Sequence, residues 1–273
     1  MKGFKIAISG KGGVGKTTIA GTLAFIYELD KKKVLVVDAD PNTNLASVLG
    51  ISYAQSSQIT PISEMIELIE ERTGAKPGTY GTFFKMNPKV DDIPDKYCYR
   101  INGIKLLIMG TVKKGGSGCV CPENVLLKRL ISHLILRRDE VVIMDMVAGV
   151  EHLGRATASA VDSLIIVVEP GQRSIQTAFT MKKLAGEIGL KNIYIILNKV
   201  RTKDEEKLLK ERLSDFEILG TINFSEKIRL ADLGQKIPFK VDKEFVKNLN
   251  QIKKKLDTKI TQKKLVKFFK SLK

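Results

Sequence analysis

A glycine-rich segment near the N-terminus limits the possible folds of this chain more than any other feature. Residues Gly10–Thr17 read Gly-Lys-Gly-Gly-Val-Gly-Lys-Thr, and they join an apolar run, Phe4–Ser9, to a helical pattern over Lys16–Glu28. In a P-loop of this form, backbone N–H groups and the helix N-terminus face phosphate oxygens. We expect Lys16 to neutralise the β- and γ-phosphates and Thr17 to offer its hydroxyl to Mg²⁺. The segment predicts a strand, a phosphate-binding loop and a helix in that order.

Further apolar runs predict the remaining strands of a central sheet. Runs such as Leu35-Val36-Val37 lack the polar alternation of a half-exposed strand. Strands of that kind are buried on both faces, as in a parallel sheet covered by helices. The predicted fold class is α/β, with a mostly parallel central sheet flanked by helices on both faces. The predicted strands are Lys33–Asp38, Glu140–Asp145, Ser163–Glu169, Asn192–Leu197 and Phe216–Ile222.

The pattern differs around Asn102-Gly103, where Lys96–Ile101 and Ile104–Met109 flank a two-residue turn. Asn-Gly favours a type I′ turn, so this segment predicts an antiparallel hairpin at one edge of the sheet. Residues 51–95 are less regular, with a helix expected near Ile62–Glu71. We therefore expect residues 51–110 to form an irregular insertion and an edge hairpin. No break in composition marks a linker, so we predict a single P-loop domain over residues 1–273.

Cysteine content and hydropathy exclude several classes of protein. The 273 residues include three cysteines, too few for a disulfide framework, and such thiols suit a reducing cytoplasm. The N-terminus has the pattern of neither a signal peptide nor a transit peptide. No segment approaches the roughly 18 uninterrupted apolar residues of a transmembrane helix. We expect a cytoplasmic protein that does not span a membrane.

The formal charge of +16 is concentrated at the C-terminal end. Residues 239–273 hold twelve lysines against three acidic residues. Apolar residues recur there at three- and four-residue steps, which predicts basic, amphipathic C-terminal helices docked on the domain. We expect the outer lysines to be solvated, with an acidic protein partner, a membrane surface or DNA as alternatives. The apolar positions are Phe245, Leu249, Ile252, Leu256 and Ile260.

Carboxylates follow two of the predicted strands. Asp38 and Asp40 lie in the segment Val-Val-Asp-Ala-Asp-Pro-Asn-Thr-Asn of residues 36–44, and Asp145 follows the run Val141–Met144. Because the carboxyl ends of parallel strands meet at one edge of a sheet, we expect these side chains beside the P-loop. The segment from Asp145 to Gly149 is typical of Walker B and switch II, with Asp145 on Mg²⁺ through water.

A second lysine, Lys11, stands at the start of the loop, where an ordinary P-loop needs none. The string from Lys11 to Thr18, Lys-Gly-Gly-Val-Gly-Lys-Thr-Thr, resembles the deviant Walker A family that includes MinD, ParA and the nitrogenase iron protein. The resemblance implies an ATPase that binds ATP or ADP with Mg²⁺ and forms a nucleotide-dependent homodimer. It also implies that Lys11 crosses the dimer interface to the partner's nucleotide, in the manner of an arginine finger supplied in trans.

The same resemblance implies roles for further residues. Asp40 matches the residue that positions the attacking water, so the implied catalytic residues are Lys11, Lys16 and Asp40. Asp38 matches a residue that supports Mg²⁺ and its waters, and Asn198 matches the adenine-recognition position. On the other side of the base pocket, many relatives have a proline where this chain has Asn223 or Phe224, so the chain departs from the family pattern there. The implied nucleotide- and Mg²⁺-binding residues are Gly12, Gly13, Val14, Gly15, Lys16, Thr17, Thr18, Asp38, Asp145 and Asn198.

The pair Cys119-Val120-Cys121 is a candidate metal site. In an extended segment, residues i and i+2 point to the same side, so two thiolates can converge on one ion. Two ligands are half a site, and a symmetric dimer would supply each cysteine twice. Cys98 in the hairpin strand, His133 in a helix and His152 could also complete it, although packing roles are expected for them. Two incidental thiols or a redox couple are the alternatives for the pair.

The pair Cys119 and Cys121 indicates a smaller group within the deviant Walker A family. Together with Asp-Met-Val-Ala-Gly-Val-Glu-His-Leu-Gly-Arg at residues 145–155, it is similar to the CooC-type accessory ATPases that mature the nickel–iron–sulfur cluster of carbon monoxide dehydrogenase. The resemblance implies ATP-dependent handling of Ni²⁺ at a dimer-interface site formed by Cys119 and Cys121, and delivery to that dehydrogenase. Relatives that serve acetyl-CoA synthase would carry the same motifs. Four thiolates bind Zn²⁺ at least as readily, so nickel follows from the resemblance alone.

Three rival functions remain. An iron–sulfur carrier like the nitrogenase iron protein shares the paired thiolates. A ParA-like positioning ATPase would use the lysine tail on DNA phosphates. A MinD-like membrane ATPase would insert a terminal amphipathic helix, for which Leu265, Val266, Phe268, Phe269 and Leu272 are available. The positioning ATPases do not explain the cysteines, so we expect no nucleic-acid partner and no membrane binding.

Overall fold

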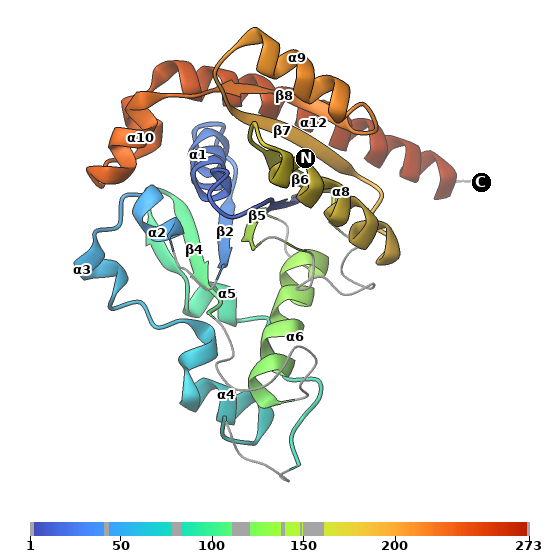
Figure 1. Ribbon diagram of the computed structural model, residues 1–273. Coiled ribbons are helices and arrows are strands. Elements are labelled where there is room, and N and C mark those ends of the chain that lie inside the picture. Colours follow the sequence, from blue (N-terminus) through green and yellow to red (C-terminus); the bar gives the residue numbers. More distant parts are fainter. Residues whose placement is uncertain are drawn as a thin grey trace.

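The computed structural model describes residues 3–40, 44–77, 83–110, 121–137, 140–147, 149 and 161–271. Its centre is an eight-stranded sheet with the order β3-β4-β2-β5-β1-β6-β7-β8 (Figure 1). Every pair of neighbouring strands is parallel except β3 and β4. The strands are β1 Lys5–Ser9, β2 Val34–Ala39, β3 Tyr99–Ile101, β4 Ile104–Ile108, β5 Val141–Met146, β6 Ser163–Val168, β7 Ile193–Val200 and β8 Glu217–Asn223.

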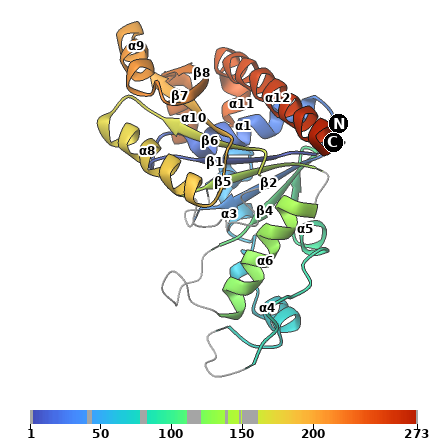
Figure 2. The same cartoon turned by 90° about the vertical axis from the view of Figure 1, so that its right-hand side faces the viewer.

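Helices cover both faces of the sheet, as the strand composition predicts (Figure 2). On one face, α1 (Lys16–Leu29) and α12 (Lys243–Ser271) pack with the short helix α2 (Leu45–Val48). On the other face, α4 (Ile66–Thr73), α6 (Pro122–Arg137), α8 (Gln172–Glu187) and α9 (Lys203–Arg212) contribute to the core. The six residues of each of β2, β5 and β6 are all buried. The remaining helices are α3 Tyr53–Ser56, η1 Ile62–Glu64, α5 Ile93–Lys96, α10 Glu226–Leu233 and α11 Pro238–Val241.

The predicted edge hairpin is present, with one correction. Asn102 and Gly103 have φ angles of 46° and 76°, as a type I′ turn requires, and Ile101 pairs with Ile104. The first strand begins at Tyr99, because residues 93–96 form the short helix α5 with proline in its first turn. Cys98 therefore precedes the strand instead of lying within it.

The helix predicted near residues 62–71 is divided in two. Residues 62–64 form the 3₁₀ turn η1, and α4 begins at Ile66 after a break at Met65. The amide of Ser63 donates to the carbonyl of Met109, 3.0 Å away, so η1 is tied to the end of β4. This bond connects the irregular segment to the carboxyl edge of the sheet.

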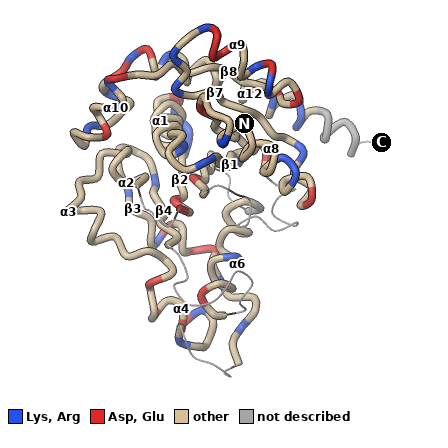
Figure 3. The backbone as a smooth tube through the Cα atoms, viewed as in Figure 1, with Lys and Arg blue, Asp and Glu red and all other residues tan. Residues whose placement is uncertain are grey.

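The apolar stripe of α12 is buried as predicted, with Leu249 and Leu256 fully inaccessible. The stripe packs in the same core as α1 and β8. Basic and acidic positions are interspersed along α9, α10 and α12 (Figure 3). No helix in the described part of the chain is both long and apolar enough to cross a membrane.

Some lysines of this tail do not lie on its outer face and have partners in the rest of the fold. The buried Lys253 lies 2.6 Å from Asp30 and 2.7 Å from Asp257. Lys263 donates to Asn192 and to the hydroxyl of Tyr194, at 2.7 and 2.8 Å. These contacts tie α12 to the rest of the fold, so part of the basic charge serves docking of the helix.

Docking of α12 leads to a stability prediction. Leu249→Ala removes a fully buried side chain and leaves a cavity, so the free energy of unfolding should fall by about 2–5 kcal/mol. Leu265→Ala, at a position of the same helix that is 51% exposed, should change it by about 0.5 kcal/mol or less. Chemical denaturation of both variants measures the difference. Equal losses would contradict the burial of this stripe.

Candidate active site

The loop between β1 and α1 has the conformation that its glycines permit. Gly13 and Gly15 have φ angles of 82° and 95°, in the left-handed region that favours glycine. A Cβ on Gly15 would also lie 2.5 Å from the side-chain amide of Asn198. Gly15 is the N-cap of α1, and no side chain in the described residues caps this helix. Its first N–H groups are therefore available to phosphate oxygens.

Lys16 begins α1 and is directed back towards the loop. Its Nζ lies 3.4 Å from the carbonyl oxygen of Lys11, and the residue is buried. A buried ammonium group directed back towards the loop is suited to neutralise a phosphate bound there. The placement agrees with the role predicted for Lys16.

Asp38 and Asp145 lie side by side at the carboxyl ends of β2 and β5. They are register partners of these neighbouring strands, and their exposed fractions are 0% and 1%. Burial raises the pKa of Asp38 to about 7, and the charge of Asp145 adds to this effect. Burial also raises the pKa of Asp145 to about 6, although its hydrogen bond with Thr17 and the charge of Lys16 oppose the shift. Each carboxylate therefore ionises less readily than one in water.

This arrangement fits a magnesium ion. The Oδ1 atom of Asp145 is buried and has no hydrogen-bond partner among the described residues, while Thr17 bonds the same carboxyl group. Carboxylate and hydroxyl oxygens are the ligands that Mg²⁺ prefers. Asp145 and Thr17 would hold the ion or its waters, with Asp38 beside them.

Asp38 also organises the segment that follows β2. Its two oxygens accept hydrogen bonds from the backbone N–H groups of Asp40 and Leu45, each at 3.2 Å. The charge of Asp40 contributes to the raised pKa of Asp145, so Asp40 lies on the same side of the site. Residues 41–43 lie outside the described part of the chain. The role of Asp40 in positioning water stays a prediction.

Ser9 is a site residue that the sequence analysis missed. Its hydroxyl donates to the carbonyl of Val147 at 2.5 Å and accepts a bond from the backbone N–H of Gly149 at 3.2 Å. The last residue of β1 thereby holds the segment that follows Asp145. A small hydroxyl residue directly before the P-loop was the available signal.

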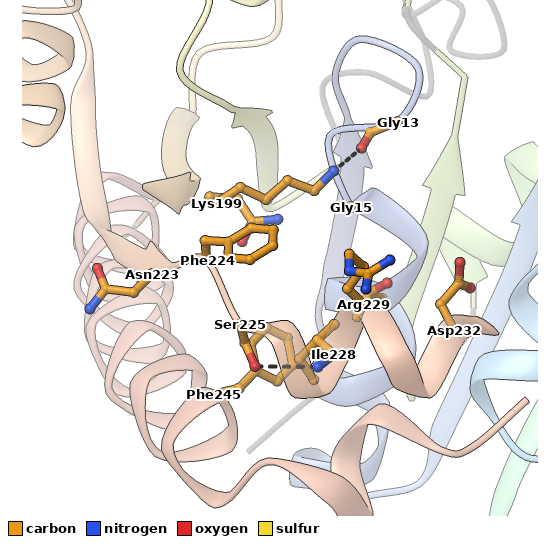
Figure 4. A pocket seen from close by; sticks show the side chains of 12 residues that line it. Gly13, Gly15, Lys199, Asn223, Phe224, Ser225, Ile228, Arg229, Asp232 and Phe245 are labelled. Carbon is orange, nitrogen blue, oxygen red and sulfur yellow. Dashed lines mark hydrogen bonds between the residues drawn. The ribbon is translucent and has the colours of Figure 1, made fainter. Parts of the chain in front are cut away.

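A hollow of about 300 Å³ opens beside the P-loop on the side of β7 and β8 (Figure 4). Asn198 lines it and donates from Nδ2 to the carbonyl of Val14 at 2.7 Å. Lys199 donates from Nζ to the carbonyl of Gly13 at 2.5 Å. These two bonds fix the loop against the end of β7. The hollow therefore lies where a base attached to P-loop phosphates would fit.

The far wall of this hollow comes from β8, α10 and α12, and it includes Asn223 and Phe224, the positions that the family resemblance implied for this side of the base pocket. Phe224 lies there, and the guanidinium of Arg201 stacks 3.7 Å from its ring centroid. The end of β8 reaches the same edge of the sheet as the P-loop. The lining residues from this side are Asn223, Phe224, Ser225, Ile228, Arg229, Asp232 and Phe245.

Lys11 is held within its own chain. Its Nζ lies 3.4 Å from one oxygen of Glu169, and Lys199 lies 3.5 Å from the other oxygen. The Lys11 side chain is 39% exposed. Glu169, directly after β6, is a second residue that the sequence analysis missed. Lys11 is therefore at the surface of the loop, whereas Lys16 is buried beneath it.

The candidate metal ligands are only partly described. Cys119 and His152 lie outside the described residues. Cys121 is half-buried and directly precedes α6, and His133 lies within that helix as predicted. Burial raises the pKa of the Cys98 thiol. Within the described ranges, no group of three or more His, Cys, Asp or Glu side chains is placed to hold a metal ion. The Cys119–Cys121 site stays a prediction.

Comparisons with known proteins agree with this geometry. The family model of the CobQ/CobB/MinD/ParA nucleotide binding domain matches residues 5–239. An uncharacterized ATP-binding protein of Methanocaldococcus jannaschii is 52% identical, over 91% of this chain and 96% of its own. The carbon monoxide dehydrogenase accessory protein CooC of Rhodospirillum rubrum is 49% identical, over 84% of this chain and 87% of its own.

Two solved structures show the same fold. The MinC:MinD cell division protein complex of Aquifex aeolicus has a chain with a TM-score of 0.66 at 19% identity, covering 93% of this chain and 95% of that one. The septum site-determining protein MinD of Pyrococcus horikoshii, complexed with Mg-ADP, has a TM-score of 0.62 at 19% identity, over 91% and 94%.

The buried carboxylates predict a pH dependence of stability. The pKa of Asp38 is about 7 in the folded protein and about 4 in an unfolded chain. Between these values the folded state binds more protons, so the free energy of unfolding should decrease as pH rises from about 4 to 7, by on the order of 3 kcal/mol. Asp38→Asn should reduce this dependence, because the amide does not titrate, and the raised pKa of Asp145, about 6, should account for the part that remains.

Denaturation in a magnesium-free buffer across this pH range measures the effect. Asp215→Asn, at an exposed position, is the control and should keep the dependence of the unchanged protein. If Asp38→Asn loses as much stability with rising pH as that control, the effect does not come from Asp38.

Proposed function

Because this chain belongs to the CobQ/CobB/MinD/ParA nucleotide-binding family and is a P-loop ATPase, we propose that it is an ATP-switched metallochaperone. Its cargo would be Ni²⁺, delivered to the metal cluster of carbon monoxide dehydrogenase during maturation. The observation that carries the proposal is the 49% identity to the carbon monoxide dehydrogenase accessory protein CooC over most of both chains. Acetyl-CoA synthase is the alternative client.

In this proposal, different side chains bind the phosphates, the base and the magnesium ion of the nucleotide. The N–H groups of residues 12–18 bind the phosphates together with Lys16, and the base enters the hollow beside Asn198. Asp145 and Thr17, with Asp38 beside them, would hold a magnesium ion, which would supply positive charge to the bound phosphates. Asp40 orients the attacking water. Ser9 restrains the segment after Asp145, and Asp38 restrains the segment after β2. These two segments respond to the γ-phosphate, so hydrolysis changes their hydrogen bonds.

Lys11 links hydrolysis to dimerisation in this proposal. Within one chain the lysine is paired with Glu169 instead of its own loop, and its partial exposure leaves it able to reach a second subunit. The pair is half-exposed, so it is weak and can be exchanged for a contact across an interface. Insertion of Lys11 beside the partner's phosphates supplies positive charge that the transition state requires.

The metal would be bound where the two subunits meet. Cys119 and Cys121 of each chain contribute two thiolates, and a two-fold axis doubles them to four. Zn²⁺ can occupy the same thiolates, so the choice of nickel depends on the relationship to CooC. The paired lysines of α12 reduce the charge available for nucleic acid, which favours a protein client.

The two lysines of the loop should differ in effect. Lys16→Ala removes a buried cation from the phosphates, so tight nucleotide binding should be lost. Lys11→Ala should leave affinity within a few-fold while hydrolysis and ATP-dependent dimerisation are lost, because its target lies in the other subunit. Calorimetry, phosphate release and size-exclusion chromatography measure the three properties. An equal loss of nucleotide affinity in both variants would argue against the interface role of Lys11.

Metal stoichiometry tests the shared site. One thiophilic ion should bind tightly per two chains, and Cys121→Ala should abolish this binding while nucleotide binding persists. Cys98→Ala, which changes a cysteine outside the pair, is the matched control and should retain the metal. ATP and metal should strengthen each other's binding, because both stabilise the closed dimer.

Competition with a chromophoric chelator, with and without a non-hydrolysable ATP analogue, measures affinity and stoichiometry. A tight ion bound to each monomer and retained in Cys121→Ala would exclude the shared site. A broad absorption near about 400 nm in protein purified without oxygen would indicate an iron–sulfur carrier instead.

A further inference from the structure

Phe224 is a half-buried aromatic residue on the wall of the hollow beside the P-loop. It directly follows β8, and its ring extends from the end of that strand toward the side of the P-loop (Figure 4). Phe245 lines the same hollow but is almost completely buried, as a phenylalanine that serves the core should be. The ring of Phe224 is instead available to something that enters the hollow.

The backbone is fixed on both sides of this ring. The N–H of Phe224 donates to the carbonyl of Val200 at 2.8 Å, which joins the residue to the end of β7. Ser225, the next residue, caps α10, because its hydroxyl accepts a bond from the N–H of Ile228 at 3.2 Å. An aromatic side chain with two rotatable bonds on a fixed backbone loses little entropy when a ligand packs against it.

A cation covers one face of the ring. The guanidinium of Arg201 lies 3.7 Å from the ring centroid of Phe224. Arg201 is exposed and does not line the hollow, so it covers the ring from the side away from it. Within the ranges that the structure describes, no aromatic ring and no second cation stacks on Phe224. The face toward the hollow can therefore accept a planar group.

Several polar side chains around the hollow already bond to the protein. Asn198 and Lys199 donate to carbonyls of the P-loop, and the guanidinium of Arg229 is paired with Glu226. These bonds hold the walls of the hollow together. Stacking needs none of these groups, because every base has a flat face that an aromatic ring can contact.

We propose that Phe224 is the stacking platform for the base of the bound nucleotide, with Arg201 holding the ring from its outer face. The cation attracts the ring through its π-electrons and so restricts the ring to one orientation. Stacking on Phe224 gives the base a share of the nucleotide affinity, besides the share of the phosphates. The assignment concerns the nucleotide alone, so it does not depend on the proposed metal or client.

The chain contains no tryptophan, so Phe224→Trp places a fluorescent probe at this position alone. ATP with Mg²⁺ should quench the fluorescence of this variant, because the base stacks on the indole. Inorganic tripolyphosphate, at a concentration that competes with ATP, should leave the fluorescence unchanged because it has no base. Phe216→Trp is the matched control, since residue 216 directly precedes β8 at the opposite end of the strand. It should respond to neither ligand.

Calorimetry with ATP and with tripolyphosphate measures the share of the base. Phe224→Ala should weaken ATP binding by about 5- to 150-fold, the range for loss of one base–aromatic stack, and change tripolyphosphate affinity by less than about twofold. Phe224→Tyr keeps the ring and should keep the affinity for ATP. Arg201→Gln should give a smaller loss than Phe224→Ala, because the ring remains but is held less firmly.

Three results would overturn the platform. ATP affinity that is unchanged in Phe224→Ala would exclude a contact with the base. Equal losses for ATP and tripolyphosphate would show that Phe224 supports the P-loop and not the base. Fluorescence that stays constant while Phe224→Trp binds ATP would exclude stacking at this position. None of these results bears on metal binding, so the proposed metallochaperone function would stand or fall separately.

Discussion

The parallel register of β1, β2 and β5 is the constraint on which the active site depends. On β2, Asp38 lies opposite Asp145 of β5. On β1, which pairs with the other edge of β5, Ile8 lies opposite the same residue. The P-loop leaves β1 one residue after Ser9, so phosphates bound to the loop lie beside both carboxylates. A shift of one residue in either pairing would turn these side chains to the other face of the sheet. Continuous apolar strands, buried from both faces, hold this register.

The carboxyl edge of the sheet carries buried negative charge that a cation would stabilise. Burial raises the pKa values of Asp38 and Asp145, and the charge of Asp145 adds to the shift of Asp38 while the charge of Asp40 adds to the shift of Asp145. Metal-free protein tolerates this cost, since the sheet around the pair is supported by extensive apolar burial on both faces. A bound magnesium ion converts the same repulsion into a ligand set. At these two positions, the carboxylates that favour binding of the Mg²⁺–nucleotide complex therefore lower the stability of the empty protein.

Sequence patterns predicted what depends on local chemistry and apolar periodicity. The P-loop, the parallel strands, the type I′ turn at Asn102-Gly103 and the docking of α12 all follow from such patterns. The patterns did not reveal Ser9 or Glu169, because these residues act through partners far away in the chain. The bond between Ser9 and Gly149 spans 140 positions, and no local rule selects such a partner. For the same reason the partners of Lys253 and Lys263 on the inner side of α12 could not be predicted from the sequence.

The order of elements along the chain offers a short route between the nucleotide site and the proposed metal site. Cys121 directly precedes α6, and the next strand after α6 is β5, which ends beside the magnesium site with Asp145. The stripe of α6 from Leu126 to Leu134 packs in the same core as Val142 and Met144 of β5. A packed core transmits displacement because it has few voids into which side chains can relax. A change in the segment after Asp145, which Ser9 holds, would thus reach the first turn of α6 through one helix and one strand. Coupling between the nucleotide and the proposed metal would then need no rearrangement of the sheet.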